Sequence, residues 1–266
     1  MAETAERVAE RIWAAWCSGE RLAARPALEG VPAGMAAQDA LRAHAGASYG
    51  WKLAATTAAG QAHVDVDGPL PGPLFTRFRR EPGDVLASEH LNMRVVEAEF
   101  AYRLGADVEP GDVLGDGRAG AGGPGWVEAV LAAVAGVHLA VEVPDSRFER
   151  FAEVGAAALL ADAACAGRFV LGPELPGWRE LDLSTATTHL WINGERAASG
   201  SGGTVMGDPR TALAWLAAEL PRHGHRLRAG DVVTTGTTTV PPTIGPGDEV
   251  RAVFDGLGEV RVAFAR

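Results

Sequence analysis

The segment Val95–Tyr102 restricts the fold most, because it places two carboxylates within a run of β-branched and aromatic residues. In an extended strand, residues i and i+2 point to the same face. Glu97 and Glu99 would therefore project together, while the apolar residues between them face the other way. Two like charges on a half-buried face repel one another and lose hydration, and a cation between them removes both penalties. A solvent-facing strand edge with two glutamates explains this segment equally well.

A second apolar segment carries one more carboxylate. Residues Val137–Val143 are apolar except for His138 and Glu142. A lone carboxylate in such a run is costly unless it is paired or bound to a metal. Three carboxylates that converge on one point form an all-oxygen site, which suits Mg²⁺ or Mn²⁺. No cysteine or histidine cluster has the spacing of a zinc site. The two segments together therefore favour a metal site made of Glu97, Glu99 and Glu142.

Composition and charge limit the partners. The chain has 266 residues, of which 47% are hydrophobic, enough for a sizeable core. The formal net charge of -10 argues against a nucleic acid and against an anionic membrane surface, but a cation can still receive a small anionic substrate. The two cysteines, Cys17 and Cys165, make no disulfide framework. The N-terminus has no signal-peptide pattern and no apolar run could cross a bilayer, so we expect a soluble cytoplasmic protein.

Periodicity and turn residues predict many short strands and few helices. Helices are expected over residues 4–19, 35–44, 126–135 and 151–166, and from Asp208-Pro209 onward. Further strands are expected over residues 49–55, 188–192, 231–234, 249–254 and 259–264, with hairpins at Asn193-Gly194 and Asp255-Gly256. The proline-rich residues 68–75 are expected to form a loop over a site, and residues 109–125 a surface excursion. This pattern favours a mixed β-roll or barrel-like core over a doubly wound sheet.

A set of short motifs occurs in an order and spacing typical of one family. The motifs are Gly50–Thr56, Val96–Ala101, Val141–Arg147, Ala161–Ala164 with Val170–Gly172, Gly207–Pro209 before Trp215-Leu216, and Gly230-Asp231 with Thr235–Thr237. Each motif alone is weak, but the ordered set spans nearly the whole chain. It resembles the 2-keto-4-pentenoate hydratase and 4-oxalocrotonate decarboxylase branch of the fumarylacetoacetate hydrolase superfamily.

The resemblance implies an α+β fold with flanking helices. Its centre would be a mixed β-roll, the fumarylacetoacetate hydrolase C-terminal-like fold, over residues 49–266, after a small N-terminal helical cap over residues 1–48. It also implies homo-oligomeric assembly and one Mg²⁺ or Mn²⁺ held by the three carboxylates. A glutamate at position 142 is typical of the hydratase and decarboxylase branch. Lys52 would be the active-site lysine, although a solvated strand lysine is the ordinary interpretation of such a residue.

Two positions depart from the family pattern. Leu70 stands where hydratases of the branch usually have an aspartate that takes part in proton transfer, so it would form an apolar wall against the substrate. Asp65 and Asp67 lie nearby but out of register. Thr237 stands where a serine is commoner, and it keeps the hydroxyl for substrate binding.

Two further charged residues fall within the motifs. Arg147 is expected to orient Glu142 or to bind the substrate carboxylate, and the alternative is a surface ion pair. Asp162 is expected to support the site from behind, and the alternative is a place on a helix surface.

The resemblance implies an enzyme, specifically a metal-dependent lyase of the hydratase type. Its substrate would be a small anionic 2-hydroxy-2,4-dienoate or 2-keto acid, converted through a metal-stabilised enolate. The alternative is a decarboxylase or tautomerase of a related 2-keto acid, including one in a biosynthetic pathway. A non-catalytic homologue is a third hypothesis, which the missing aspartate would suit. The three carboxylates and Lys52 argue against it.

Overall fold

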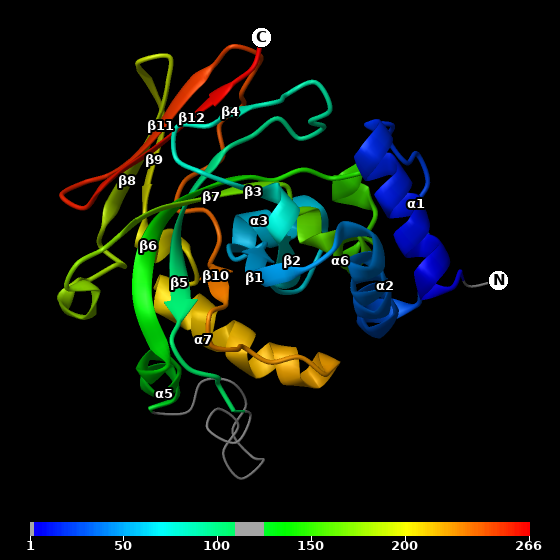
Figure 1. Ribbon diagram of the computed structural model, residues 1–266, viewed down its shortest axis with the longest axis horizontal. Coiled ribbons are helices and arrows are strands. Elements are labelled where there is room, and N and C mark those ends of the chain that lie inside the picture. The colour runs from blue at the N-terminus through cyan, green and yellow to red at the C-terminus, as the bar shows by residue number, and fades with distance from the viewer. Residues whose placement is uncertain (1–2, 110–124) are drawn as a thin grey trace.

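Two β-sheets form the centre of the computed structural model, which describes residues 3–109 and 125–266 (Figure 1). The predicted surface excursion therefore lies almost wholly outside the described residues. The seven-stranded sheet has the order β2 (Leu70–Phe75), β1 (Ser48–Ala54), β10 (Val232–Thr234), β5 (Glu97–Leu104), β6 (Val134–Val143), β7 (Arg168–Glu174) and β3 (Arg79–Arg80). The five-stranded sheet has the order β4 (Val85–Leu86), β12 (Gly258–Phe264), β11 (Glu249–Phe254), β8 (Thr187–Ile192) and β9 (Glu195–Ser201).

The main hydrophobic core lies between the two sheets. The rings of Phe100 on β5 and Phe254 on β11 meet edge to face at 5.1 Å between centroids, and both side chains are fully buried. The residues of β5 that alternate with Glu97 and Glu99 belong to this core. The period-two pattern of the strand therefore sends its apolar residues inward and leaves the carboxylates on the opposite face.

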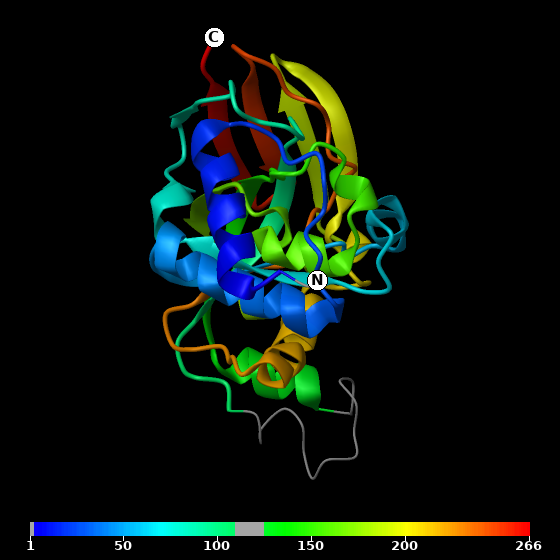
Figure 2. The same ribbon diagram turned by 90° about the vertical axis from the view of Figure 1, so that its right-hand side faces the viewer.

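Helices surround the sheets. They are α1 (Ala5–Ser18), α2 (Gly30–Ala45), α3 (Ala58–Val64), α5 (Trp126–Ala132), α6 (Ala156–Ala161) and α7 (Pro209–Glu219). Helices α1 and α2 lie together at one side of the molecule, in front of the sheets in the turned view (Figure 2). They pack on each other and on α6 around a second core that includes Phe75 and Phe148. Within the described part of the chain, no helix is both long and apolar enough to cross a bilayer.

Most expected elements are present, and both hairpins are confirmed. Asn193 and Gly194 both have positive φ, as a two-residue turn between β8 and β9 requires. Asp208 caps α7 by accepting a hydrogen bond from the amide of Arg210. The mixed β-roll with flanking helices is the fold that the sequence predicted.

Two expectations about single elements were wrong. Residues 70–75 form β2 rather than a loop, and its prolines are tolerated because β2 is an edge strand that pairs only with β1. The single helix expected over residues 151–166 is instead a short α6 between two 3₁₀ turns, η2 (Phe151–Glu153) and η3 (Ala163–Cys165). Gly155, with φ 78°, separates η2 from α6. Helix α3 was not expected.

Candidate metal centre

Strands β5 and β6 bring three carboxylates together. The two strands are antiparallel, and their register sets Glu97 directly opposite Glu142. Glu99 lies two residues further along β5 on the same face. One carboxylate oxygen from each residue lies within 4.8 Å of the others. Glu97, Glu99 and Glu142, here called the carboxylate trio, therefore converge as the sequence predicted.

Burial raises the pKa of all three carboxyl groups. Glu99 and Glu142 are at most 1% exposed. Loss of hydration, together with repulsion from Glu142, raises the pKa of Glu97 to about 7. Loss of hydration also raises the pKa of Glu99 to about 8, with Glu97 as the next cause. The same loss raises the pKa of Glu142 to about 8, although Lys52 opposes the shift. All three pKa shifts are upward, the direction that burial of neighbouring like charges produces.

The trio also leaves buried oxygen atoms without partners. Glu99 Oε2 accepts hydrogen bonds from the hydroxyl of Thr234 and, at 3.1 Å, from the amide of Gly236. Glu99 Oε1 and Glu142 Oε2 are buried without a hydrogen-bond partner, and Glu142 Oε1 has only the ion pair with the Lys52 ammonium, described below. Unpaired buried carboxylate oxygens are rare in proteins unless an ion meets them. The donor set is all oxygen, so the residues fit a hard divalent cation such as Mg²⁺ or Mn²⁺.

Lys52 lies beside the trio. It sits on β1 and is 2% exposed. Its Nζ lies 3.3 Å from Glu142 Oε1 and donates a hydrogen bond of 3.1 Å to the carbonyl oxygen of Ala164. Burial lowers the pKa of Lys52, but Glu142 and the other two carboxylates outweigh it, so the net direction is upward. We expect a divalent cation bound at the trio to lower the pKa of Lys52 by like-charge repulsion, so the direction in the metal-loaded site stays a prediction.

Lys52 is also the only lysine among the 24 lysines and arginines of the chain. All the other residues in this count are arginines, and the one lysine occupies a buried position. Lysine carries a compact charge whose pKa shifts readily on burial, whereas the guanidinium stays charged. The single lysine is thus a signal in the sequence itself that singles out position 52.

The carbonyl that accepts from Lys52 belongs to an unusual turn. Ala163, Ala164 and Cys165 have φ of 54°, 51° and 60°, so three consecutive residues other than glycine are left-handed. Each costs roughly 1–2 kcal/mol relative to a right-handed conformation. Strain of this kind persists only where surrounding contacts impose it.

Arg147 and Asp162 supply those contacts. The carboxylate of Asp162 accepts hydrogen bonds from the amide and Nε of Arg147 and, at 2.7 Å, from the hydroxyl of Ser146. The guanidinium donates to the carbonyls of Asp162 and, at 2.8 Å, of Ala166, which flank the left-handed turn. It also lies over the ring of Trp16, 3.7 Å from the centroid. The pair holds the turn from both ends.

The structure therefore does not bring Arg147 into the pocket. Its side chain is 1% exposed and bonded to Asp162, so it is neither a surface ion pair nor free to meet a substrate carboxylate. Asp162 is fully buried, which excludes the helix-surface alternative. It lies one layer behind Lys52, with the turn of residues 163–165 between them.

Removing the carboxylate of Asp162 should destabilise the protein strongly. Asp162→Ala leaves the buried guanidinium of Arg147 without its counterion, and breaking such a pair costs about 3–5 kcal/mol. The free energy of unfolding in urea measures the effect. Glu153→Ala is the matched control, because Glu153 pairs with Arg150 at an exposed position and should change stability by less than about 1 kcal/mol. A loss below about 1 kcal/mol for Asp162→Ala would contradict the role given to this pair.

A cavity of about 550 Å³ opens above Lys52 and Glu97. Leu70 and Thr237, both expected at the substrate, line it. Leu70 lies on β2 opposite Ala54 of β1. The hydroxyl of Thr237 donates a hydrogen bond of 2.9 Å to the carbonyl of Thr239. Asp65 and Asp67 are exposed and do not line the cavity, so neither replaces the missing aspartate at this wall.

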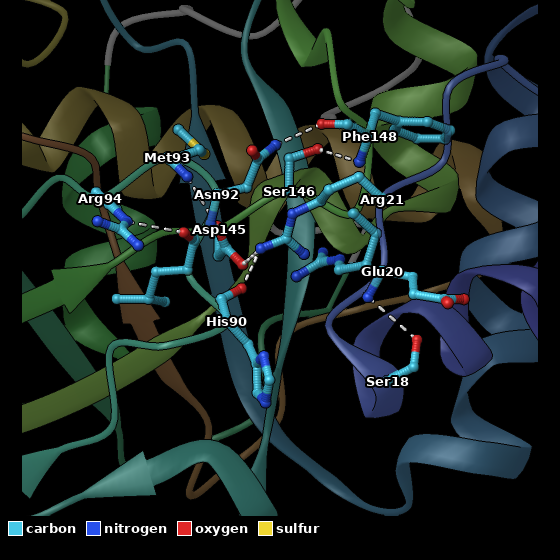
Figure 3. A network of polar contacts seen from close by, with 12 residues as sticks. Ser18, Glu20, Arg21, His90, Asn92, Met93, Arg94, Asp145, Ser146 and Phe148 are labelled. Atoms are coloured by element: carbon cyan, nitrogen blue, oxygen red, sulfur yellow. Dashed lines mark hydrogen bonds and ion pairs between the residues drawn. The ribbon is translucent and has the colours of Figure 1, made fainter.

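Asp145 fixes another part of the cavity wall (Figure 3). Its Oδ1 accepts hydrogen bonds from the amides of Asn92 at 2.6 Å and Met93 at 3.0 Å. Its Oδ2 lies 3.5 Å from a guanidinium nitrogen of Arg21. The segment before β5 is thereby tied to the end of β6, and Met93 is held in the lining of the cavity. Sequence reasoning missed this function of Asp145, because the contact joins residues far apart in the chain.

Comparison with known proteins agrees with this geometry. Residues 94–265 match the fumarylacetoacetate (FAA) hydrolase C-terminal family. Over 216 residues the chain is 32% identical to 4-oxalocrotonate decarboxylase of Pseudomonas putida, covering 81% of this chain and 76% of that protein. Over 216 residues it is also 32% identical to 2-keto-4-pentenoate hydratase of Burkholderia vietnamiensis, covering 81% of this chain and 77% of that protein. The chain therefore belongs to the fumarylacetoacetate hydrolase C-terminal family, as its motifs predicted.

Solved structures support the same conclusion. 4-Oxalocrotonate decarboxylase from Pseudomonas putida G7, complexed with magnesium and adipate, matches with a TM-score of 0.85 at 27% identity, covering 98% of this chain and 97% of that chain. The same enzyme complexed with calcium and acetate matches with a TM-score of 0.84. Both of those structures contain a divalent metal ion, magnesium in one and calcium in the other.

Proposed function

We propose that this protein is a divalent-metal-dependent lyase that acts on a 2-hydroxy-2,4-dienoate or the corresponding 2-oxo acid. The observation that carries the proposal is the carboxylate trio, which converges beside Lys52, while Glu97 and Lys52 themselves line a cavity. Glu97, Glu99 and Glu142 would hold the cation, which we propose to be Mg²⁺ or Mn²⁺. The similarity to a hydratase and a decarboxylase supports the substrate class.

The cation site, Lys52 and Leu70 have different proposed roles in the reaction. A divalent cation held by Glu97, Glu99 and Glu142 would supply a Lewis acid to the 2-oxo acid end of the substrate. Lys52 holds a proton at the inner end of the cavity and can exchange it with the substrate. Leu70 excludes water from the wall where the hydratases of the branch carry an aspartate. The step shared by hydration and decarboxylation, exchange between enol and keto forms, needs only the first two groups.

Decarboxylation of a related 2-oxo acid is the second candidate. Two observations favour it. Leu70 is 6% exposed and makes its side of the cavity apolar, which disfavours a water nucleophile. The decarboxylase match covers nearly the whole chain.

Replacing Leu70 separates these reactions. With Mg²⁺, the unmodified protein should catalyse enol–keto exchange of 2-hydroxypenta-2,4-dienoate but hydrate it weakly. Leu70→Asp should raise hydration, because it restores a group that can carry a proton. Loss of dienol absorbance, paired with proton NMR in D₂O, distinguishes exchange from water addition.

Leu70→Asn is the matched control, because it is polar but cannot transfer a proton and should leave hydration weak. Rapid hydration by the unmodified protein would contradict the role given to Leu70. Absence of metal-dependent exchange with this acid and with longer 2-hydroxydienoates would contradict the proposed function.

A further inference from the structure

Apolar side chains make up a large part of the cavity lining. Leu70 and Leu159 are buried members of one hydrophobic cluster, and Val64, Met93 and Phe151 pack against it. All five residues line the cavity. Val240 lines it too and is 81% exposed. The apolar part of the lining therefore includes buried residues such as Leu70 and also the solvent-exposed Val240.

Fixed positive charge in the cavity lining comes from one buried residue. Lys52 is the only lysine or arginine among the described residues that line the cavity, and its ammonium is engaged by Glu142 and the Ala164 carbonyl. His63 is the only other lining residue that can become positive; it is exposed, and its ring contacts that of Phe151 at 5.7 Å between centroids. A second carboxylate on a substrate would enter this apolar region without a fixed cation, and burying an unpaired charge is costly.

The cavity is also larger than a five-carbon acid needs. Its volume of about 550 Å³ lies within the range of sites that enclose drug-sized ligands, about 300–1,000 Å³. The segment that carries Met93 is held in place by Asp145, so this wall is built before any ligand arrives (Figure 3).

We propose that the cavity selects a monocarboxylic 2-oxo or 2-hydroxydienoic acid with an extended apolar tail and discriminates against dicarboxylic acids. The inference rests on the proposed function, since the 2-oxo acid end is placed at the carboxylate trio and Lys52. The tail lies along Leu70, Met93 and Phe151 and ends near Val240.

Calorimetric titration in Mg²⁺ at pH 8 tests the inference with stable acids. Pyruvate, 2-oxopentanoate and 2-oxooctanoate share the acid end and differ in tail length. Each added methylene should tighten binding, up to about fourfold where it is fully buried. The decisive pair has equal carbon number: 2-oxohexanoate should bind at least about tenfold more tightly than 2-oxohexanedioate.

Two variants test whether a positive charge added at the cavity has a different effect from one added elsewhere on the surface. Val240→Arg should strengthen the binding of 2-oxohexanedioate about three- to fivefold, because the new guanidinium can form an exposed ion pair with the second carboxylate. Val85→Arg is the matched control, because Val85 is 68% exposed on β4 and does not line the cavity. It should leave the affinities for 2-oxohexanoate and 2-oxohexanedioate unchanged.

The outcomes distinguish the two proposals. Pyruvate that binds without gain from a longer tail, or a dicarboxylate that binds as tightly as its monocarboxylic partner, overturns the inference and leaves the proposed function standing. The second result would favour decarboxylation of a dicarboxylic acid. Failure of every acid to bind in Mg²⁺ overturns both proposals.

Discussion

Metal-free Glu99→Gln is expected to be more stable than the unmodified protein at pH 8 and to gain nothing from Mn²⁺. The carboxyl group of Glu99 has its pKa raised from 4.5 to about 8 by burial. Between these values the folded protein binds more protons than the unfolded chain, so the free energy of unfolding falls as pH rises through this window. A neutral glutamine removes that cost, which is on the order of 4 kcal/mol at pH 8.

The same substitution should abolish tight metal binding. Glutamine can still accept the hydrogen bonds from Thr234 and Gly236, so the strand should keep its geometry. It brings no negative charge, however, and Mn²⁺ affinity should fall at least about 100-fold, since even residues behind metal ligands contribute tenfold or more. Urea unfolding with EDTA or Mn²⁺ measures both effects.

Glu195→Gln on β9 is the matched control, because Glu195 is exposed and its replacement should change stability by no more than about 0.5 kcal/mol. In the unmodified protein, the affinity for Mn²⁺ should rise with pH up to about 8, because the cation must displace protons from the trio. If metal-free Glu99→Gln were less stable than the unmodified protein and still gained stability from Mn²⁺, the trio would not be a metal site.

Lys52→Met is expected to slow metal-dependent enol–keto exchange at least about 100-fold while leaving metal binding intact. A positioned acid or base contributes roughly 10²–10⁴-fold to proton transfer, and methionine fills similar space without a proton to give. Because the Lys52 ammonium lies 3.3 Å from Glu142, its loss removes a like charge from the neighbourhood of a bound cation. Mn²⁺ affinity should therefore stay equal or increase.

Proton NMR in D₂O measures the exchange rate, and calorimetry measures the affinity. Arg196→Met, at an exposed position of β9, is the control and should change neither quantity. If Lys52→Met exchanged the substrate at a rate within a factor of about three of the unmodified protein, Lys52 would not take part in proton transfer.

The carboxylate trio could be predicted because its geometry is local. The two-residue period of a strand puts Glu97 and Glu99 on one face, and one antiparallel neighbour is enough to bring Glu142 opposite. The local sequence pattern did not show whether Lys52 is buried or solvated. Its burial depends on β10, which pairs with β1 from a distant part of the chain.

The region behind Lys52 could not be predicted for a related reason. The alanine-rich run to residue 166 has helical periodicity, and nothing in that pattern shows three left-handed residues. They are imposed by Arg147 and Asp162, whose pairing is a tertiary contact. Helix α3 was missed because its seven residues bury no side chain and so have no apolar stripe.

The single lysine allows the most direct test of the proposed metal centre. In protein labelled with ¹³C only in lysine, one set of side-chain signals reports Lys52 and nothing else. Mn²⁺ is paramagnetic, and if the trio holds it, the ion would lie close to the Lys52 ammonium, so one equivalent should broaden the Cε–Hε signal beyond detection. Mg²⁺ should shift the signal without broadening it, and Glu99→Gln should keep it sharp at the same Mn²⁺ concentration. A sharp and unshifted Lys52 signal in the unmodified protein at saturating Mn²⁺ would show that the cation binds elsewhere, and would contradict the account.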